Sequence, residues 1–351
     1  MTKTVLWWGR FDPDYSRNRI LRKCFLSLGW EVRDFHPRVG PLAGLQAMLQ
    51  GIEAPDLVWV PAFRQRDIKA ATRWARSKGV PIIFDPMISA FDKQVFERQK
   101  FPATSRKAMK LLQWEKKRLH AADMVLADTR HHADFFVETF DLPAEATAVV
   151  ALGAEEGIFK PAHLDVRPAD APLEALFFGS FIDLQAPAVI IEAAKLCTAP
   201  VRWTLLGEGP LKGPCMTQAA GHPAIFFEDY LPYAELPTRI HRADILLGIF
   251  GTTDKAARVI PNKVYQSLAA ERPVVTRASG AYPEVDKAGG LIQIAPGSPE
   301  ALAWTVSDLN EKRDELPKRA RAARYYYDLH FGRKNVEEQL ARALDRIMAS
   351  G

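Results

Sequence analysis

The sequence predicts an α/β protein built from two doubly wound domains, each with a parallel sheet covered by helices. Short apolar runs alternate with longer amphipathic stretches along the 351 residues, which is typical of strands joined by crossover helices. The alternation stops at a proline-rich stretch and then restarts, which indicates two domains. Hydrophobic residues make up 48% of the chain, enough for each half to bury a core of its own.

The first half carries the pattern of one such domain, which we expect over residues 1–160. Buried parallel strands are nearly continuous apolar runs. On this ground we expect strands over 4–8, 56–60, 81–84, 124–127 and 148–151. Helical periodicity predicts helices over 18–28, 67–78, 105–121 and 130–139.

The second half repeats the pattern after a break. Pro161, Pro168 and Pro172 punctuate a polar stretch that we expect to be a linker over 161–172, followed by a domain over 173–332. The expected strands are 175–178, 202–206, 225–227, 245–249, 274–276 and 291–294. The expected helices are 189–196, 234–241, 262–270 and 299–309. The charged segment 313–349 is almost wholly helical in its pattern.

Composition excludes several classes of protein. Cys24, Cys197 and Cys215 are too few and too far apart for a disulfide framework or a zinc cluster. The histidines have no metal-binding spacing, so we expect no metal. No apolar run reaches eighteen residues and no cleavable leader is recognisable, so we expect a cytoplasmic protein without a transmembrane helix.

Positive charge is concentrated in residues 93–118, although the net charge of the whole chain is only +5. The two acids in this stretch are Glu97 and Glu115, against nine basic residues: Lys93, Arg98, Lys100, Arg106, Lys107, Lys110, Lys116, Lys117 and Arg118. Such a stretch suits an anionic membrane surface or a lipid phosphate; the alternative is a solvated helix face. Aromatic residues interleave it too sparsely for nucleic acid. We therefore expect peripheral contact with the inner face of a membrane, and no nucleic-acid partner.

Polar residues follow the predicted strands of the first half. Ligands of open parallel sheets bind beyond the carboxyl ends of the strands, so with two domains we expect the site in the cleft between them. Gly9 allows a close backbone approach, and Arg10 and Arg17 can hold phosphate or carboxylate. The alternative is that these arginines pair locally with Asp12 and Asp14.

A carboxylate follows another strand of this half. Asp85 comes directly after the strand expected at 81–84, where it can bind sugar hydroxyls or accept a proton. Its alternative role is to cap a turn or helix. Arg64 follows the strand expected at 56–60 in the same way.

The second half has two glycine turns after strands. Gly179 with Ser180 follows one strand, and Gly207 with Gly209 follows the next. Backbone N–H groups in such turns can face phosphates, although any strand-to-helix turn can use glycine.

The richest segment of the second half is 248–269. Lys255 and Arg258 precede Pro261, which marks the start of a helix whose first N–H groups suit a diphosphate. Lys263 adds positive charge, and Gln266 lies one turn further and can bind a diol. The alternative is a basic surface loop before an ordinary crossover helix.

These motifs resemble those of the retaining GT-B glycosyltransferases of family four, over nearly the whole chain. Residues 260–270 with 273–275 are similar to the donor-site helix of that family, and 205–211 resemble its G-x-G-P turn. Residues 229–233 resemble its base-contacting loop. The segment 313–349 resembles its C-terminal helices, of which the last, here 333–349, crosses back to pack on the first domain.

The resemblance implies two facing Rossmann-like domains and transfer from a nucleotide-diphosphate sugar to a glycolipid or polysaccharide acceptor, with retention, no metal and no cofactor. It implies catalytic roles for Asp85 and Arg10. The implied acceptor-side residues are Gly9, Asp12, Arg17, Asn18 and Arg64. The implied donor-binding residues are Gly179, Ser180, Gly207, Tyr230, Leu231, Lys255, Arg258, Pro261, Asn262, Lys263 and Gln266.

The chain departs from the family pattern in ways that resemble a subset of bacterial surface-polysaccharide transferases. Arg258 and Gln266 replace the usual E-x7-E pair, while Ser180 and Gln185 replace the usual Arg and Lys. Phosphate binding is then expected from Lys255, Arg258 or Lys263. Two alternatives stay open: a catalytically silent nucleotide- or glycan-binding protein of this fold, and a sugar-nucleotide epimerase, whose usual acidic and histidine cluster is not evident.

Overall fold

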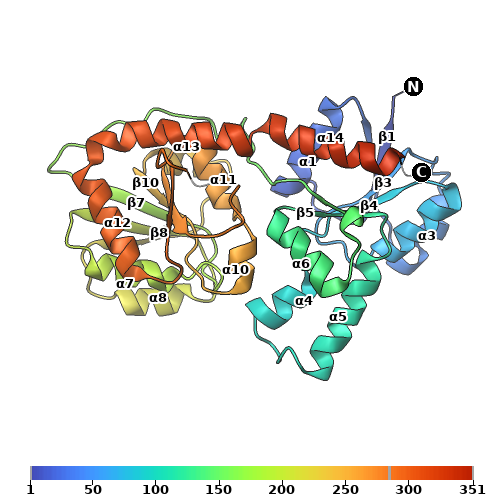
Figure 1. Cartoon of the computed structure of the whole chain (residues 1–351), viewed down its shortest axis with the longest axis horizontal. Coiled ribbons are helices and arrows are strands. Elements are labelled where there is room, and N and C mark those ends of the chain that lie inside the picture. Colours follow the sequence, from blue (N-terminus) through green and yellow to red (C-terminus); the bar gives the residue numbers. More distant parts are fainter. Residues whose placement is uncertain (1, 284–285, 350–351) are drawn as a thin grey trace. The chain divides into compact units, whose positions relative to one another are not determined.

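The computed structural model describes residues 2–283 and 286–349, and the chain divides into two compact units (Figure 1). The first unit contains the chain up to Leu152 together with the last helix, which begins at Arg333. The second unit runs from Gly153 to Gly332. Each unit has its own six-stranded sheet and its own hydrophobic core.

The first unit has a wholly parallel sheet in the order β2-β1-β3-β4-β5-β6. Its strands are β1 (Thr4–Trp8), β2 (Glu31–Phe35), β3 (Leu57–Val60), β4 (Ile82–Phe84), β5 (Met124–Ala127) and β6 (Thr147–Val149). Its α-helices are α1 (Ser16–Ser27), α2 (Ala43–Leu49), α3 (Ile68–Lys78), α4 (Ala90–Asp92), α5 (Arg106–Leu119), α6 (Arg130–Phe140) and α14 (Arg333–Ala349). The strand order reverses between β1 and β3, so a ligand-binding crevice is expected beside the loops that follow them.

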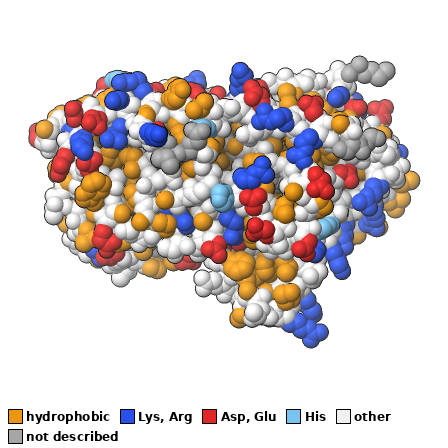
Figure 2. Space-filling view, viewed as in Figure 1, with side chains coloured by type: hydrophobic (Ala, Val, Ile, Leu, Met, Phe, Trp, Pro, Cys, Tyr) orange, Lys and Arg blue, Asp and Glu red, His pale blue; other side chains and the backbone are white. Residues whose placement is uncertain are grey.

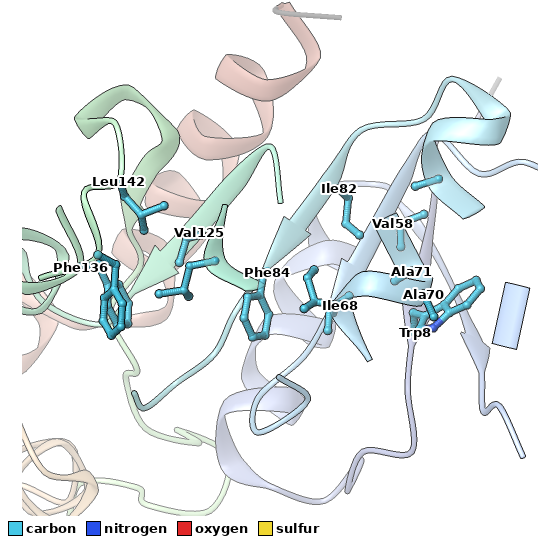
Figure 3. Close-up of a cluster of buried hydrophobic side chains, with 14 of the residues drawn as sticks. Trp8, Val58, Ile68, Ala70, Ala71, Ile82, Phe84, Val125, Phe136 and Leu142 are labelled. Carbon is cyan, nitrogen blue, oxygen red and sulfur yellow. The ribbon is translucent and has the colours of Figure 1, made fainter. Parts of the chain in front are cut away.

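The core of the first unit covers both faces of its sheet. Alternate side chains of a strand point to opposite faces: Trp7 stacks on Trp59, with ring centroids 5.5 Å apart, while Trp8 packs on Trp74 of α3. Figure 3 shows the cluster that contains Trp8, with Phe84 and the neighbouring apolar side chains lying between strands and helices.

The second unit also has a wholly parallel sheet, in the order β12-β11-β10-β7-β8-β9. Its strands are β7 (Leu173–Phe178), β8 (Val201–Leu206), β9 (Ile225–Glu228), β10 (Ile245–Leu247), β11 (Val274–Arg277) and β12 (Leu291–Ile294). Its α-helices are α7 (Pro187–Leu196), α8 (Lys212–Ala219), α9 (Leu236–His241), α10 (Asp254–Arg258), α11 (Asn262–Ala269), α12 (Pro299–Glu311) and α13 (Leu316–His330). Here the order reverses between β7 and β10.

The boundary between the units lies earlier than the expected linker at 161–172. The segment from Gly153 belongs to the second unit because it is tied there: the Ala154 amide donates to the Tyr327 hydroxyl at 3.0 Å, and Tyr233 donates to Glu155 at 2.9 Å. Residues 161–170 contain no helix or strand, but Leu164 is buried in the core of the second unit.

The last helix completes the first unit. Helix α14 packs on α1 and β6 and buries Val336, Leu340 and Leu344. The Gln339 side chain accepts a hydrogen bond from the Ala151 amide at 2.8 Å. This 17-residue helix thus supplies part of the core of the first unit. In sequence, the whole second unit separates it from the rest of the first unit.

Several elements differ from the sequence-based expectations. Strand β2 was not expected because only Phe35 of its five residues is buried, so it lacks the apolar run of a central strand. Helices α2 and α8 were not expected either, and α10 lies where a loop was expected. The helical segment 313–349 is interrupted at Gly332, where an added Cβ would lie 3.0 Å from the Asp328 carbonyl oxygen.

Candidate functional site

Two glycine turns of the second unit are in backbone contact. A Cβ on Gly207, after β8, would lie 2.1 Å from the carbonyl oxygen of Gly179, after β7. The φ angle of Gly179 is +139° and that of Gly207 is +132°, which disfavours other residues. The two turns pack together as only glycines allow, at the carboxyl ends of adjacent strands.

The ammonium group of Lys263 lies beside the Gly179 turn. Lys263 is the second residue of α11, and its side chain is buried. Its Nζ donates to the Gln185 side-chain oxygen at 2.5 Å and lies 3.4 Å from the centroid of the Phe177 ring. A Cβ on Gly179 would lie 3.1 Å from this Nζ. Lys263 and Gly179, which are 84 positions apart in sequence, therefore meet at one point.

The Lys263 ammonium has no counter-charge among the described residues. No carboxylate of the described residues forms an ion pair with it, and burial lowers the pKa of Lys263 well below its ordinary value. A bound anion at this point would stabilise the charged ammonium, because a nearby opposite charge favours the ionised form. The position is therefore suited to a phosphate group.

The loop after β10 packs on the loop after β7, at the reversal of the strand order. A Cβ on Gly251 would lie 2.5 Å from the Leu184 carbonyl oxygen, and the Phe250 amide donates to the Gln185 carbonyl at 3.2 Å. Arg277, buried at the end of β11, holds this loop by donating to the Gly251 carbonyl at 2.6 Å. Sequence reasoning missed Arg277; an arginine ending an otherwise apolar strand was the available signal.

Two short helices follow that loop. Thr253 caps α10, which carries the buried Lys255 and the half-buried Arg258. Pro261 is the N-cap of α11, and no side chain caps the first turn of that helix, so its N–H groups can bind an anion.

The remaining predicted donor residues lie around this start of α11 or further from it. The Asn262 side-chain oxygen is buried without a hydrogen-bond partner among the described residues. Gln266 lies one turn along α11 and is 7% exposed. Tyr230 and Leu231 follow β9, the edge strand of the sheet, and the Tyr230 side chain is 68% exposed. Ser180 is exposed next to Gly179.

In the first unit, Arg17 and Asp85 form a buried ion pair, and each is 1% exposed. Arg17 Nε donates to one Asp85 oxygen at 2.9 Å and Nη2 to the other at 3.1 Å. Arg17 Nη1 also donates to the carbonyl oxygens of Val150 and Ala151. The pair thus joins α1, the end of β4 and the segment after β6. The catalytic role of Asp85 and the acceptor-side role of Arg17 stay predictions, and both groups are closed to solvent here.

The loops after β1 and β3 are in contact where the strand order of the first unit reverses. A Cβ on Gly9 would lie 2.8 Å from an Asp67 oxygen and 3.2 Å from Arg64 Nε. Arg64 is paired with Asp67. Arg10 lies apart from them and donates to the Pro37 carbonyl at 2.7 Å, in the loop after β2. The structure therefore brings Gly9 and Arg64 together but not Arg10.

Asp12 and Asn18 stabilise the turn before α1. The Asn18 side chain donates to the Asp12 carbonyl at 2.7 Å, and the Asp12 carboxylate accepts from the Asp14 amide at 2.9 Å. The alternative interpretation, in which Arg10 and Arg17 pair with Asp12 and Asp14, is wrong: Arg17 pairs with Asp85 and Arg10 donates to backbone carbonyls. The arginine that pairs with Asp14 is Arg19, at 3.8 Å.

Neither a metal-binding cluster nor a membrane-spanning helix occurs in the described parts of the chain. Among residues 2–283 and 286–349, no three His, Cys, Asp or Glu side chains come together as a metal site. None of the helices in the described parts of the chain combines the length and apolar character needed to cross a bilayer.

Comparisons with known proteins agree with this geometry. Residues 172–312 match the family described as "Glycosyl transferases group 1". No curated protein matches the sequence. Among solved structures, HepE from Anabaena in complex with UDP is similar with a TM-score of 0.71 and 15% identity, over 98% of this chain and 99% of that one.

Two further solved structures extend the likeness. Sucrose-phosphate synthase from Thermosynechococcus elongatus has a TM-score of 0.76 at 13% identity, over 99% of this chain and 100% of that one. A glycosyltransferase from Rickettsia africae has a TM-score of 0.69 at 12% identity, over the whole of both chains. The likeness shows the GT-B fold, as expected from the sequence, and the family match over 172–312 makes the protein a glycosyltransferase.

We predict that Asp85→Asn lowers the free energy of unfolding by about 3–5 kcal/mol, because it leaves the Arg17 charge buried without its partner. The matched control is Asp34→Asn, which breaks the more exposed bidentate pair with Arg22 and should cost less than about 1 kcal/mol. Urea unfolding measures both. An Asp85→Asn protein as stable as the control, yet inactive, would show that Asp85 serves catalysis rather than the fold.

Proposed function

We propose that this glycosyltransferase moves a sugar from a nucleotide-diphosphate donor to a glycolipid or polysaccharide acceptor, with retention and without a metal ion. The observation that carries the proposal is the buried Lys263 ammonium beside the Gly179 turn. A leaving diphosphate needs fixed positive charge. Lys263 provides it from the protein, and the uncapped start of α11 adds the positive end of a helix dipole.

The position of Lys263 can compensate for the two basic residues of the family pattern that this chain lacks. The resemblance leads us to expect a lysine at position 185 and an arginine at 180, where this chain has Gln185 and Ser180. Lys263 Nζ, on α11, lies 2.5 Å from the Gln185 side chain. It therefore places a positive charge beside position 185, where the loop after β7 lacks the lysine of the family pattern. This supports a working donor site rather than a catalytically silent protein.

The proposed roles follow the places of the residues. Gly179, Gly207 and Lys263 hold the diphosphate, with further charge from Lys255 and Arg258. Asn262 and Gln266 bind hydroxyls of the ribose or sugar, for which the unpartnered oxygen of Asn262 is an acceptor.

Base recognition falls to the loop after β9, which carries Tyr230 and Leu231. The related HepE structures contain UDP or UDP-glucose, so we propose uridine as the first base to test. The proposed biological role is the synthesis of a bacterial surface polysaccharide, with the acceptor bound by the first unit.

The direct test is a thermal-shift panel of UDP, GDP, ADP, CMP and dTDP in the presence of EDTA. A ligand that binds only the folded protein raises its melting temperature, so we expect one diphosphate to stand out. The matching sugar nucleotide should then be consumed in EDTA, and NMR of the product should show the donor's anomeric configuration. No shift with any diphosphate would contradict the donor site.

We expect Lys263→Gln to weaken binding of the selected diphosphate at least about tenfold, because a charge-assisted contact is lost. The double variant Gln185→Lys/Lys263→Gln returns the ammonium from the other side of the same contact and should recover most of the affinity. Lys212→Gln is the control, since Lys212 is paired with Glu208 and Asp229. Isothermal titration calorimetry measures all four proteins, and equal affinities would remove Lys263 from the site.

The lowered pKa of Lys263 predicts that diphosphate binding takes up a proton. In the free protein the folded-state pKa lies below the ordinary 10.5, and the bound anion raises it. The affinity for the diphosphate should therefore fall as the pH rises above the lowered pKa of Lys263 in the free protein. Without ligand, this group makes the fold more stable as the pH rises towards 10.5, since the unfolded chain binds the proton more tightly. Calorimetry in buffers of different ionisation enthalpy counts the proton, and Lys263→Gln should abolish the uptake.

A further inference from the structure

The first unit contains a large cavity that the donor site does not use. Its volume is about 1060 Å³, just above the usual range for small-molecule sites. It is lined by the loop after β3 and by side chains of α3 and α5. It therefore opens at the carboxyl end of β3, next to the reversal of the strand order, where ligands of such sheets bind.

Most of the charged side chains that line the cavity are basic. Its only acidic residue, Asp67, is already paired with Arg64. Among the described residues, no carboxylate forms an ion pair with the five other basic side chains of the lining: Arg66, Lys69, Arg73, Lys110 and Arg118. Figure 2 shows Lys and Arg side chains gathered over the part of the first unit where α3 lies. Five like charges around one hollow repel one another unless an anion joins them.

Arg118 is the lining residue whose surroundings most clearly call for an anion. Its guanidinium lies 3.6 Å from the centroid of the Trp114 ring, and its Nε is buried without a hydrogen-bond partner among the described residues. Burial and the charge of Arg66 lower the pKa of Arg118. A buried N–H of a charged group without an acceptor is costly, and an anionic oxygen in the cavity could accept it.

Helix α5 also carries a buried acid, Glu115, whose carboxylate is hydrogen-bonded to the start of α4. Glu115 is fully buried and accepts hydrogen bonds from the Ser89 hydroxyl and from the amides of Ala90 and Phe91, at the start of α4. These neutral donors hold its carboxylate in place without removing its charge. Glu115 does not line the cavity, and its charge only partly offsets the effects of burial and of Arg66 on the pKa of Arg118.

We infer that this cavity holds the phosphate or diphosphate group of the acceptor, so that the acceptor substrate is a phosphate ester. This inference rests on the proposed function for the meaning of "acceptor". Several converging cations suit a group with more than one negative charge, whereas a neutral glycan would leave them unpaired. Half-buried Leu111 and Trp114 provide an apolar wall for the organic part of the ester.

The test measures binding of inorganic pyrophosphate by calorimetry in the Lys263→Gln background, which weakens the donor site. Adding Lys69→Gln and Arg73→Gln removes two cations of the lining and should weaken pyrophosphate at least about tenfold. The matched control adds Arg106→Gln and Lys107→Gln, which remove the same charge from exposed positions of α5 outside the cavity. Equal affinities in the two proteins would overturn the inference.

Two further arms separate the sources of the phosphate. Co-sedimentation with phosphatidylglycerol vesicles, lost with Lys69→Gln/Arg73→Gln but not with the control, would assign a lipid-borne phosphate. Binding of glucose 6-phosphate with the same dependence would assign a soluble ester. Lys110→Gln, on α5, repeats the test if the α3 variant melts at a lower temperature. Failure of pyrophosphate, vesicles and glucose 6-phosphate alike to bind the protein would overturn the inference.

The donor site is assayed separately, so that the two proposals can fail independently. In the protein that retains Lys263, the affinity for UDP should be unchanged by Lys69→Gln/Arg73→Gln. If no nucleoside diphosphate binds the unaltered protein while pyrophosphate still depends on Lys69 and Arg73, the proposed function fails and the anion site stands. The reverse result leaves the donor site and removes the phosphate-bearing acceptor.

Discussion

The contact between the buried Lys263 ammonium and Gln185 is the interaction on which the proposed donor site of the second unit depends. This contact fixes the start of α11 against the loop after β7, and that loop in turn packs on the loop after β10. A cation held in an apolar, well-packed place cannot reorient when a ligand arrives, so its field is already directed at the point where charge must be neutralised. In the proposed site, the glycine turns matter because they would leave room for a phosphate beside Lys263.

Much of the fold could be predicted from the sequence because buried parallel strands are apolar throughout. Strands such as β1 and β12 have the expected bounds, whereas β2 was missed because its exposed edge position needs no apolar run. Glycine positions at strand ends were also readable. What could not be read was which side chains meet: Arg17 and Asp85 follow different strands, and only the sheet order brings them together as a closed pair.

Charge shows the same limit in another form. Counting residues 93–118 finds a basic segment, but it does not find that Arg66, Lys69 and Arg73, from a different segment, complete the cationic surface. Lys69 and Arg73 lie four positions apart on α3 and therefore share one face of that helix, which was the signal available, whereas Arg66 precedes the helix. Electrostatic fields depend on positions in space, and a one-dimensional count cannot supply them.

The return of α14 to the first unit has a consequence for how the protein is made. A ribosome finishes all six strands of the first sheet long before it reaches Arg333, yet Leu340 and Leu344 belong to the core of that unit. During synthesis the first unit is therefore incomplete while the whole second unit emerges and folds. Its nascent form exposes an apolar strip on α1 and β6, so the period of greatest vulnerability to aggregation ends only when the last helix leaves the ribosome.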